Sequence, residues 1–289
     1  MTGDCHVQFG ERLAGKFRWP TYLDVTIDYR ELLPTIDLSK DISKSALKKL
    51  REQLEGKVKE YAQNKILPFL VETTQSDFYG QDFHFELSDD GEKLRVHYPT
   101  LFESGEGYLQ TNVLIEFGGC NSIQPNDSHS IKTILSEVTS DLVLPVAQVN
   151  VLNPSRTFWE KATLIHVECH RGRLNTSPER LSRHWYDLAK LSQSWVGVNA
   201  LSDRKLLEDV IVHKKAFFNA SYANYDHCLN GRFRLVPKKD EINNLKSDYT
   251  KMHNVGMFSA HQPSFDDLIK DIMLVEGKIN SMDRAFIDQ

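Results

Sequence analysis

Residues 150–161, N-V-L-N-P-S-R-T-F-W-E-K, decide the fold, because the character of the chain changes within them. An apolar run over residues 143–152, predicted as a strand, ends here and Pro154 turns the chain. Ser155 or Thr157 can then cap a helix that we predict from Thr157 onward. Lys161 lies one turn inside this helix, where the helix dipole favours a phosphate, although an ordinary surface salt bridge is the alternative.

Before this boundary the chain has the periodicity of strands around one long helix. The alternation of polar and apolar residues predicts strands at residues 24–29, 82–87, 94–98, 109–117 and 143–152. An Asp-Gly turn joins the second and third into a hairpin. Pro145 and Gln148 place the last strand at an edge or a bend. Residues 43–72 form an amphipathic helix with Ser43 or Ser45 as its cap and Pro68 at a break or last turn.

After the boundary the chain has the periodicity of helices. Capping residues ahead of apolar periods predict helices at residues 157–171, 177–194, 203–222, 240–252 and 264–280. Strands first and helices second predict an α+β fold. We therefore expect a sheet domain at residues 1–153 and a helical domain at residues 154–289.

The composition is that of a globular protein: of 289 residues, 40% are hydrophobic and 26% are charged. No stretch approaches the ~20 apolar residues of a membrane span, and the N-terminus lacks a secretory signal. Four separated cysteines without a C-x-x-C pair argue against a disulfide framework and predict a cytoplasmic protein. Because no apolar span is found, we expect no membrane partner.

The charge is unevenly distributed. A net charge of −5 gives no global attraction to nucleic acid. Between Arg156 and Lys190, however, seven Lys/Arg stand against four Asp/Glu. Such a local excess can face phosphate, and a solvated helical face is the alternative.

Two carboxylates of the predicted sheet are candidate metal ligands. Asp24 stands at the head of a strand, and Glu116 lies within the apolar strand V-L-I-E-F. Burying a carboxylate is costly unless it is paired or holds a metal, and Mg²⁺ prefers oxygen ligands. Glu116 facing solvent is the alternative. Asp28, on the same side of the strand, lies about 13 Å from Asp24 and is too far away to share a metal ion.

A second candidate group lies on the predicted helix R-L-S-R-H-W-Y-D-L, residues 180–188. Arg183 and Asp187 are four residues apart and share a helix face, as a structural ion pair would. Alternatively, Asp187 orients Arg183 or Lys161 toward a triphosphate.

A third group consists of His166 and His170, which also have i,i+4 spacing. This spacing resembles a zinc pair. Val167 stands where a metalloprotease has its glutamate, so the pattern argues against zinc.

These pieces, in this order, resemble the AbiEii/AbiGii nucleotidyltransferase toxin family. The densest matches are V-L-N-P-S-R-T-F-W-E-K-A-T-L-I-H (151–166) and R-L-S-R-H-W-Y-D-L (180–188). Further matches are D-V-T-I-D-Y-R (24–30), V-L-I-E-F-G-G (113–119), L-L-E-D-V-I-V-H-K (206–214) and R-L-V-P (234–237). The resemblance spans almost the whole chain from Asp24. It implies a nucleotidyltransferase-like mixed β-sheet core flanked by helices and followed by a helical C-terminal region.

The resemblance also implies an activity and residue roles. Members of the family transfer a nucleotide from an NTP to an acceptor, in some cases tRNA, with a divalent metal such as Mg²⁺. They act as toxins restrained by a separately encoded antitoxin. Asp24 and Glu116 match metal-binding, catalytic carboxylates. Lys161 matches the motif lysine, which is catalytic and contacts the nucleotide phosphates, and Arg183 and Asp187 match a nucleotide-binding helix.

Residues 1–23 depart from the family pattern. Tyr22 stands where the first aspartate of a D-x-D pair is expected, and neutral tyrosine is a poor Mg²⁺ ligand. Residues 5–11, C-H-V-Q-F-G-E, replace a glycine-rich phosphate loop. Three explanations are open: a catalytically degenerate homologue that only binds nucleotide, RNA or antitoxin; a start further upstream; or a loop of altered spacing at Gly15-Lys16. A metal-dependent hydrolase using Asp24 and Glu116 is a further functional hypothesis.

Overall fold

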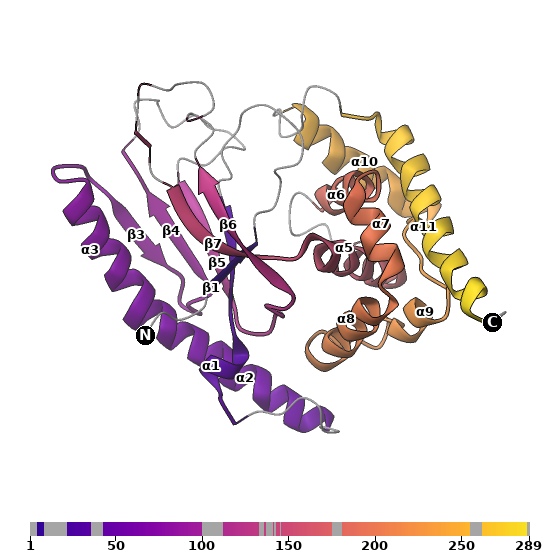
Figure 1. Cartoon of the computed structure of the whole chain (residues 1–289), viewed down its shortest axis with the longest axis horizontal. Coiled ribbons are helices and arrows are strands. Elements are labelled where there is room, and N and C mark those ends of the chain that lie inside the picture. Colours follow the sequence, from indigo (N-terminus) through magenta and orange to yellow (C-terminus); the bar gives the residue numbers. More distant parts are fainter. Residues whose placement is uncertain are drawn as a thin grey trace. The chain divides into compact units, whose positions relative to one another are not determined.

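The computed structural model describes residues 5–8, 22–35, 43–99, 112–132, 136, 141, 143–144, 146–174, 181–254 and 262–287. It is an α+β structure, as the sequence predicts (Figure 1). Among the described residues, those up to Asn153 form one compact unit, the sheet unit, and those from Pro154 form another, the helical unit. No described helix is long and apolar enough to cross a membrane.

The sheet unit is built on a mixed sheet. Its strands are β1 (Cys5–Gln8), β2 (Tyr22–Ile27), β3 (His84–Leu87), β4 (Lys93–His97), β5 (Asn112–Gly118), β6 (Asn126–Lys132) and β7 (Val146–Leu152). They lie in the order β3-β4-β5-β2-β1-β7-β6. The β2–β5 and β1–β7 pairs are parallel, and the other pairs are antiparallel.

The sheet unit has a short helix, α1 (Tyr29–Leu32), and a continuous helical run. The run consists of α2 (Lys44–Tyr61), the π-helical segment η1 (Ala62–Ile66) and α3 (Leu67–Asp77). Ser43 caps α2 as predicted, because its Oγ accepts the Ala46 N–H at 3.3 Å. The run continues five residues beyond the predicted end at Glu72 (Asp77 against Glu72). Pro68 does not end it, because it stands in the first turn of α3, where its missing N–H is tolerated.

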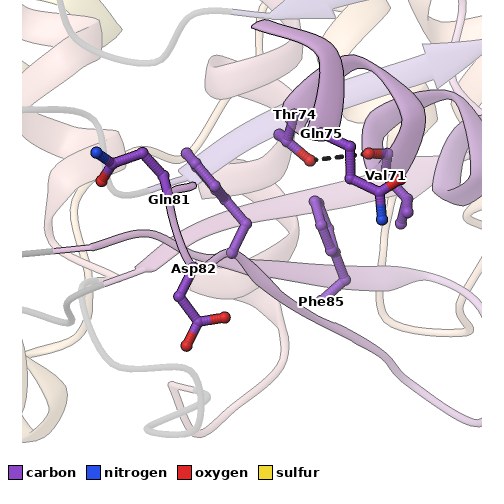
Figure 2. A pocket seen from close by; sticks show the side chains of 7 residues that line it. Val71, Thr74, Gln75, Gln81, Asp82 and Phe85 are labelled. Atoms are coloured by element: carbon purple, nitrogen blue, oxygen red, sulfur yellow. Dashed lines mark hydrogen bonds between the residues drawn. The ribbon is translucent and has the colours of Figure 1, made fainter. Parts of the chain in front are cut away.

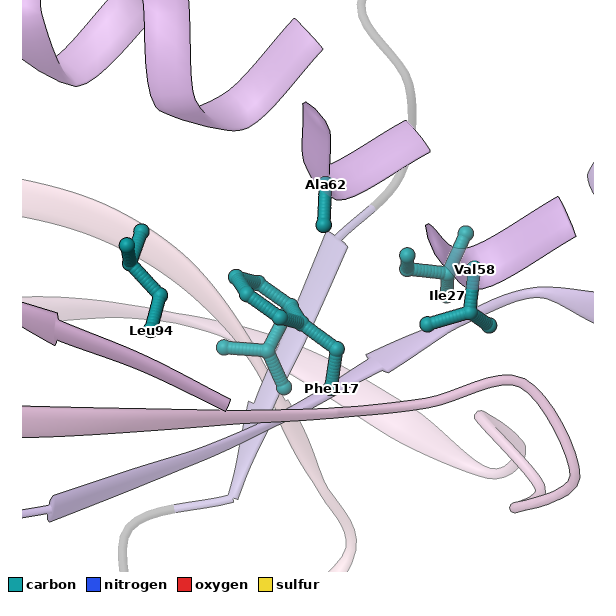
Figure 3. Close-up of a cluster of buried hydrophobic side chains, with 6 residues drawn as sticks. Ile27, Val58, Ala62, Leu94 and Phe117 are labelled. Carbon is teal, nitrogen blue, oxygen red and sulfur yellow. The ribbon is translucent and has the colours of Figure 1, made fainter. Parts of the chain in front are cut away.

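The strands β2 to β5 have one apolar face, which α2, η1 and α3 cover. Ile27, Leu94 and Phe117 point from the sheet toward these helices, which contribute buried side chains such as Ala62 (Figure 3). Val25 belongs to the same buried cluster. Since side chains alternate along a strand, the intervening residues lie on the opposite face, which we call the polar face. Its described residues are His84, Glu86, Lys93, Arg95, His97, Asn112, Leu114, Glu116, Asp24 and Thr26.

Three strand predictions need correction. The strand predicted over residues 24–29 ends at Ile27, because Asp28 caps α1. The strand predicted at an edge or a bend, now β7, is paired on both sides, so the edge alternative is wrong. Pro145 precedes its first residue, Val146, and so lies outside the ladder. Next to it, β6 forms one edge of the sheet, and β3 forms the other. The strand β6 was not predicted, because a solvated edge strand such as N-D-S-H-S-I-K lacks an apolar alternation.

The hairpin of β3 and β4 is confirmed, and its register runs from Leu87 opposite Leu94 to His84 opposite His97. Gly91 takes a φ of +74° in the turn, which glycine adopts without a steric penalty. The strand predicted from residue 109 is described from Asn112 as β5, and residues 109–111 lie outside the described residues.

The helical unit contains α5 (Pro154–His170), α6 (Arg183–Ser192), α7 (Trp195–Ser202), α8 (Arg204–Phe217), α9 (Tyr225–Leu229), α10 (Lys239–Asn254) and α11 (Phe265–Ile287). Two tryptophans anchor its core: Trp159 donates from Nε1 to the Ala200 carbonyl at 3.1 Å, and Trp185 donates to the Leu235 carbonyl at 2.9 Å. Both indoles are fully buried. The motif aromatics therefore hold α5 and α6 in place.

The helix boundaries differ from the predictions in several places. The first helix starts at Pro154, three residues before Thr157, because proline fits a first turn. The helix predicted over 177–194 is described from Arg183, and residues 175–180 lie outside the described residues. The helix predicted over 203–222 ends at Phe217. The short helices α7 and α9 were not predicted, because two turns or fewer carry little periodicity.

Candidate functional site

Asp24 and Glu116 are direct neighbours in the sheet unit. They are Cα partners in the parallel ladder of β2 and β5, so both side chains lie on the polar face. Both are half-buried, and the Glu116 side chain is 35% exposed. Glu116 is thus neither fully buried nor fully solvated. Two half-buried carboxylates side by side offer the oxygen ligands that a hard divalent cation prefers.

Lys93 stands on the other side of Glu116. It is the Cα partner of Glu116 in the antiparallel ladder of β4 and β5, and its Nζ lies 3.3 Å from Oε1 of Glu116. The Lys93 side chain is 46% exposed. Three adjacent strands therefore line up an aspartate, a glutamate and a lysine. Lys93 was not predicted as a site residue, because in the sequence it falls at the end of the predicted hairpin turn.

The Asp28 carboxylate, which follows Asp24 in the same segment, binds Arg30 instead of facing Glu116. The Asp28 carboxylate accepts the backbone N–H of Arg30 at 2.8 Å and pairs with the Arg30 guanidinium at 2.6 Å. It follows the strand and caps α1, so it does not share the face of Asp24 as a strand residue. Tyr22 begins β2 opposite Leu114, two residues before Asp24. Gly15 and Lys16, the alternative phosphate loop, lie outside the described residues.

In the helical unit, α5 and α6 bring Lys161 and Asp187 together. The Lys161 Nζ lies 2.6 Å from Oδ2 of Asp187, and the two side chains are only 17% and 12% exposed. Asp187 therefore contacts Lys161, which is one of the two partners predicted for it. A partly desolvated ion pair holds its ammonium in one place, as a phosphate contact requires.

Arg183 and His184 lie next to this pair at the start of α6. Arg183 is the first residue of the helix and is half-buried. Burial, together with the charges of Lys161 and Arg183, lowers the pKa of His184 well below its usual range. His184 is therefore neutral at pH 7. Lys161 and Arg183 contribute positive charge here, and Asp187 contributes negative charge.

His166 and His170 are joined by His227, and one ring nitrogen of each lies within 4.8 Å of the others. The hydrogen bonds argue against zinc. The Nδ1 atom of His166 accepts the Arg234 N–H at 3.0 Å, so the neutral ring carries its proton on Nε2, which faces the Asn224 carbonyl at 3.3 Å. With this tautomer His166 directs no lone pair at a metal ion. The argument against zinc thus rests on the tautomer of His166, whereas the sequence argument rested on the missing glutamate. The hydrogen bonds give His166 a structural role.

This cluster makes stability depend on pH. Burial, together with the neighbouring His170, lowers the pKa of His166 to about 4. In the unfolded chain His166 takes up a proton near pH ~6.5, whereas in the folded chain its lower pKa keeps it neutral. Stability is therefore lost as the pH falls from ~6.5 toward ~4. We expect the free energy of unfolding to fall by about 1.4 kcal/mol per pH unit for this residue. Urea unfolding of the full chain near pH 7 and near pH 5 measures it.

Two variants isolate the contribution of His166. His166→Asn should reduce the dependence on pH and leave the part that comes from His170 and His184, whose pKa values are also lowered. His253→Asn, on the exposed side of α10, should leave the dependence as in the wild type. If both variants keep the wild-type slope, His166 does not fold in its neutral form.

The sheet unit also has a pocket of about 220 Å³ between α3 and β3 (Figure 2). It is lined by Val71, Thr74, Gln75, Gln81, Asp82, Phe83 and Phe85. The Thr74 hydroxyl donates back to its own helix at the Leu70 and Val71 carbonyls. Phe85 belongs to the apolar face, so the pocket lies on the side of the sheet opposite Asp24 and Glu116. It is not the carboxylate site.

A mixed sheet with helices on its apolar face and a carboxylate pair on its polar face is a nucleotidyltransferase-like core. The model of the family described as "Nucleotidyl transferase AbiEii toxin, Type IV TA system" matches residues 23–271. The chain therefore belongs to the AbiEii family of nucleotidyl transferase toxins, as its motifs indicate. The match includes all five predicted site residues and begins directly after Tyr22. Comparisons with curated proteins and with solved structures give no match.

Proposed function

We propose that this chain transfers a nucleotide from an NTP to an RNA acceptor, with tRNA as the first candidate. The observation that supports the proposal is the register of Asp24 with Glu116 on adjacent parallel strands. Membership in a toxin–antitoxin family implies a cognate antitoxin as partner. We also propose that the protein acts in the cytoplasm, where both NTPs and tRNA are found.

The carboxylate pair fits a divalent cation, because both groups are half-buried oxygen donors on one face. Mg²⁺ bound there would neutralise triphosphate charge and activate the α-phosphate. Asp24 and Glu116 would hold that ion. Within the helical unit, considered by itself, Lys161 is held by Asp187 and can donate to phosphate oxygens, as can Arg183. The acceptor hydroxyl forms the new bond to the α-phosphorus and loses its proton, while pyrophosphate leaves.

The test is label transfer by the purified full chain. Each of four NTPs labelled at the α-phosphate is incubated with total tRNA and Mg²⁺, and label in RNA is counted. Asp24→Asn and Glu116→Gln should each lower incorporation by about 100-fold or more, since each removes a charge that acts on the transition state. Asp77→Asn at the end of α3 and Glu52→Gln on α2 should retain it. Equal activity in all four variants would refute the role of the pair.

A second function is a homologue that binds nucleotide, RNA or antitoxin without transferring a nucleotide. Tyr22 in β2, where a second aspartate would supply another oxygen ligand, favours it. Under this alternative the wild-type chain incorporates no label, yet NTP raises its melting temperature in a thermal-shift titration. Incorporation that depends on Asp24 excludes the alternative.

A further inference from the structure

The polar face carries a permanent positive charge where a nucleotidyltransferase site needs cations. Lys93 pairs with Glu116 at 3.3 Å, and Glu116 in turn neighbours Asp24. Two carboxylates and one ammonium give this trio a net charge of −1, from −2 and +1. The trio therefore attracts a divalent cation less than a bare carboxylate pair would.

Lys93 also has unused donor capacity. An ammonium group has three N–H donors, and among the described residues the one ion pair of Lys93 is with Glu116. Its side chain is nearly half exposed, so phosphate oxygens can reach it. Arg95 lies two residues further along β4 on the same face, opposite Leu114. The strand thus presents two cations beside the carboxylates.

We propose that Lys93 is the fixed cation of this site: it neutralises Glu116 and donates to the NTP phosphates, so that nucleotide binding depends less on divalent metal. The proposal rests on the proposed function, because it assigns the NTP to the polar face. It makes Lys93 a nucleotide-binding residue of the sheet unit. The resemblance gave it no role.

Nucleotide affinity with and without metal tests the proposal. The dissociation constants for GTP and CTP are measured by calorimetry for the full chain, once with Mg²⁺ and once with EDTA. We expect the wild type to bind in EDTA and Lys93→Met to bind about 10-fold or more weakly there. Lys93→Arg should stay within about 3-fold of the wild type, because it keeps the charge. Lys48→Met, on the exposed surface of α2, is the matched control.

The metal dependence separates binding from a structural role. Without the competing ammonium, Lys93→Met should gain more affinity from Mg²⁺ than the wild type does, because Glu116 becomes available to the metal ion. An ion pair that only stabilises the hairpin would change the melting temperature and leave this ratio unchanged. A wild type that binds nucleotide only with Mg²⁺, or a variant with the wild-type ratio, overturns the proposal.

Failure of this inference and failure of the proposed function give different results. Lys93-dependent binding without label transfer supports the inference and refutes transfer. Label transfer that requires Asp24, together with a Lys93→Met variant whose affinities match the wild type, supports the function and refutes the inference.

Discussion

Trp159→Ala is expected to lower the free energy of unfolding of the helical unit by about 3–5 kcal/mol. The indole is fully buried, and its ring meets Phe158 edge-on at a centroid distance of 5.0 Å. Removing it leaves a cavity and takes away one of the two donors of the Ala200 carbonyl, which keeps the Asp203 N–H at 3.1 Å. Urea unfolding followed by circular dichroism measures the change.

The same substitution at Trp195 is the control. That indole begins α7 and is 62% exposed, so Trp195→Ala should change stability by no more than about 0.5 kcal/mol. Losses of equal size in the two variants would contradict the anchoring role of Trp159. The comparison also bears on activity assays. Substituting a tryptophan of the family motif can lower activity by destabilising the helical unit, even when the tryptophan takes no part in the chemistry.

Breaking the ion pair between Lys161 and Asp187 is expected to have the second-largest effect. Lys161→Met or Asp187→Leu alone leaves one charge in a mostly buried position and should cost about 3 kcal/mol. This figure is the lower end of the range for buried pairs, because some of each side chain contacts solvent. The double variant should recover most of the loss, since neither charge remains. A double-mutant cycle by urea unfolding gives the interaction energy.

An exposed pair in the same unit provides the reference. Lys246 on α10 and Asp266 on α11 lie 3.2 Å apart, with side chains 52% and 73% exposed, and should couple by less than about 1 kcal/mol. Equal coupling in the two cycles would show that burial does not strengthen the Lys161–Asp187 pair. The stable double variant then separates folding from binding. It lacks the Lys161 ammonium, so retained NTP affinity in it would remove Lys161 from the phosphate contacts.

Periodicity predicted the elements whose buried residues repeat regularly. Leu50, Leu54 and Val58 mark the covered side of α2, and Val25 and Ile27 alternate along β2. Both patterns follow from the repeat of the backbone. Polar β6 has no such pattern, because solvent contacts most of its side chains, and so it was missed.

The partners of the candidate residues depended on packing that no local pattern encodes. Asp24 and Glu116 were each identified from strand context, but their direct register joins segments far apart in the sequence. Asp187 had a helical neighbour at Arg183 and a distant candidate in Lys161, and only the packing of α5 against α6 establishes the contact with Lys161. The importance of Lys93 required the three-strand register, since the turn motif alone assigned it a local role.

The π-helical segment η1 limits how the covering helix can vary. Its hydrogen bond from the Leu67 N–H to the Ala62 carbonyl spans five residues, one more than in an α-helix. The wide turn takes up one residue more than an α-helical turn does, so the residues after it keep the direction that an α-helix one residue shorter would give them. Deleting one residue of the exposed stretch 63–65 should therefore convert the segment to α-helix and leave Leu70 packed against the sheet. Inserting a residue there should instead rotate α3 by about 100° relative to α2 and turn Leu70 away from the sheet. This connection thus tolerates the loss of one residue better than the gain of one.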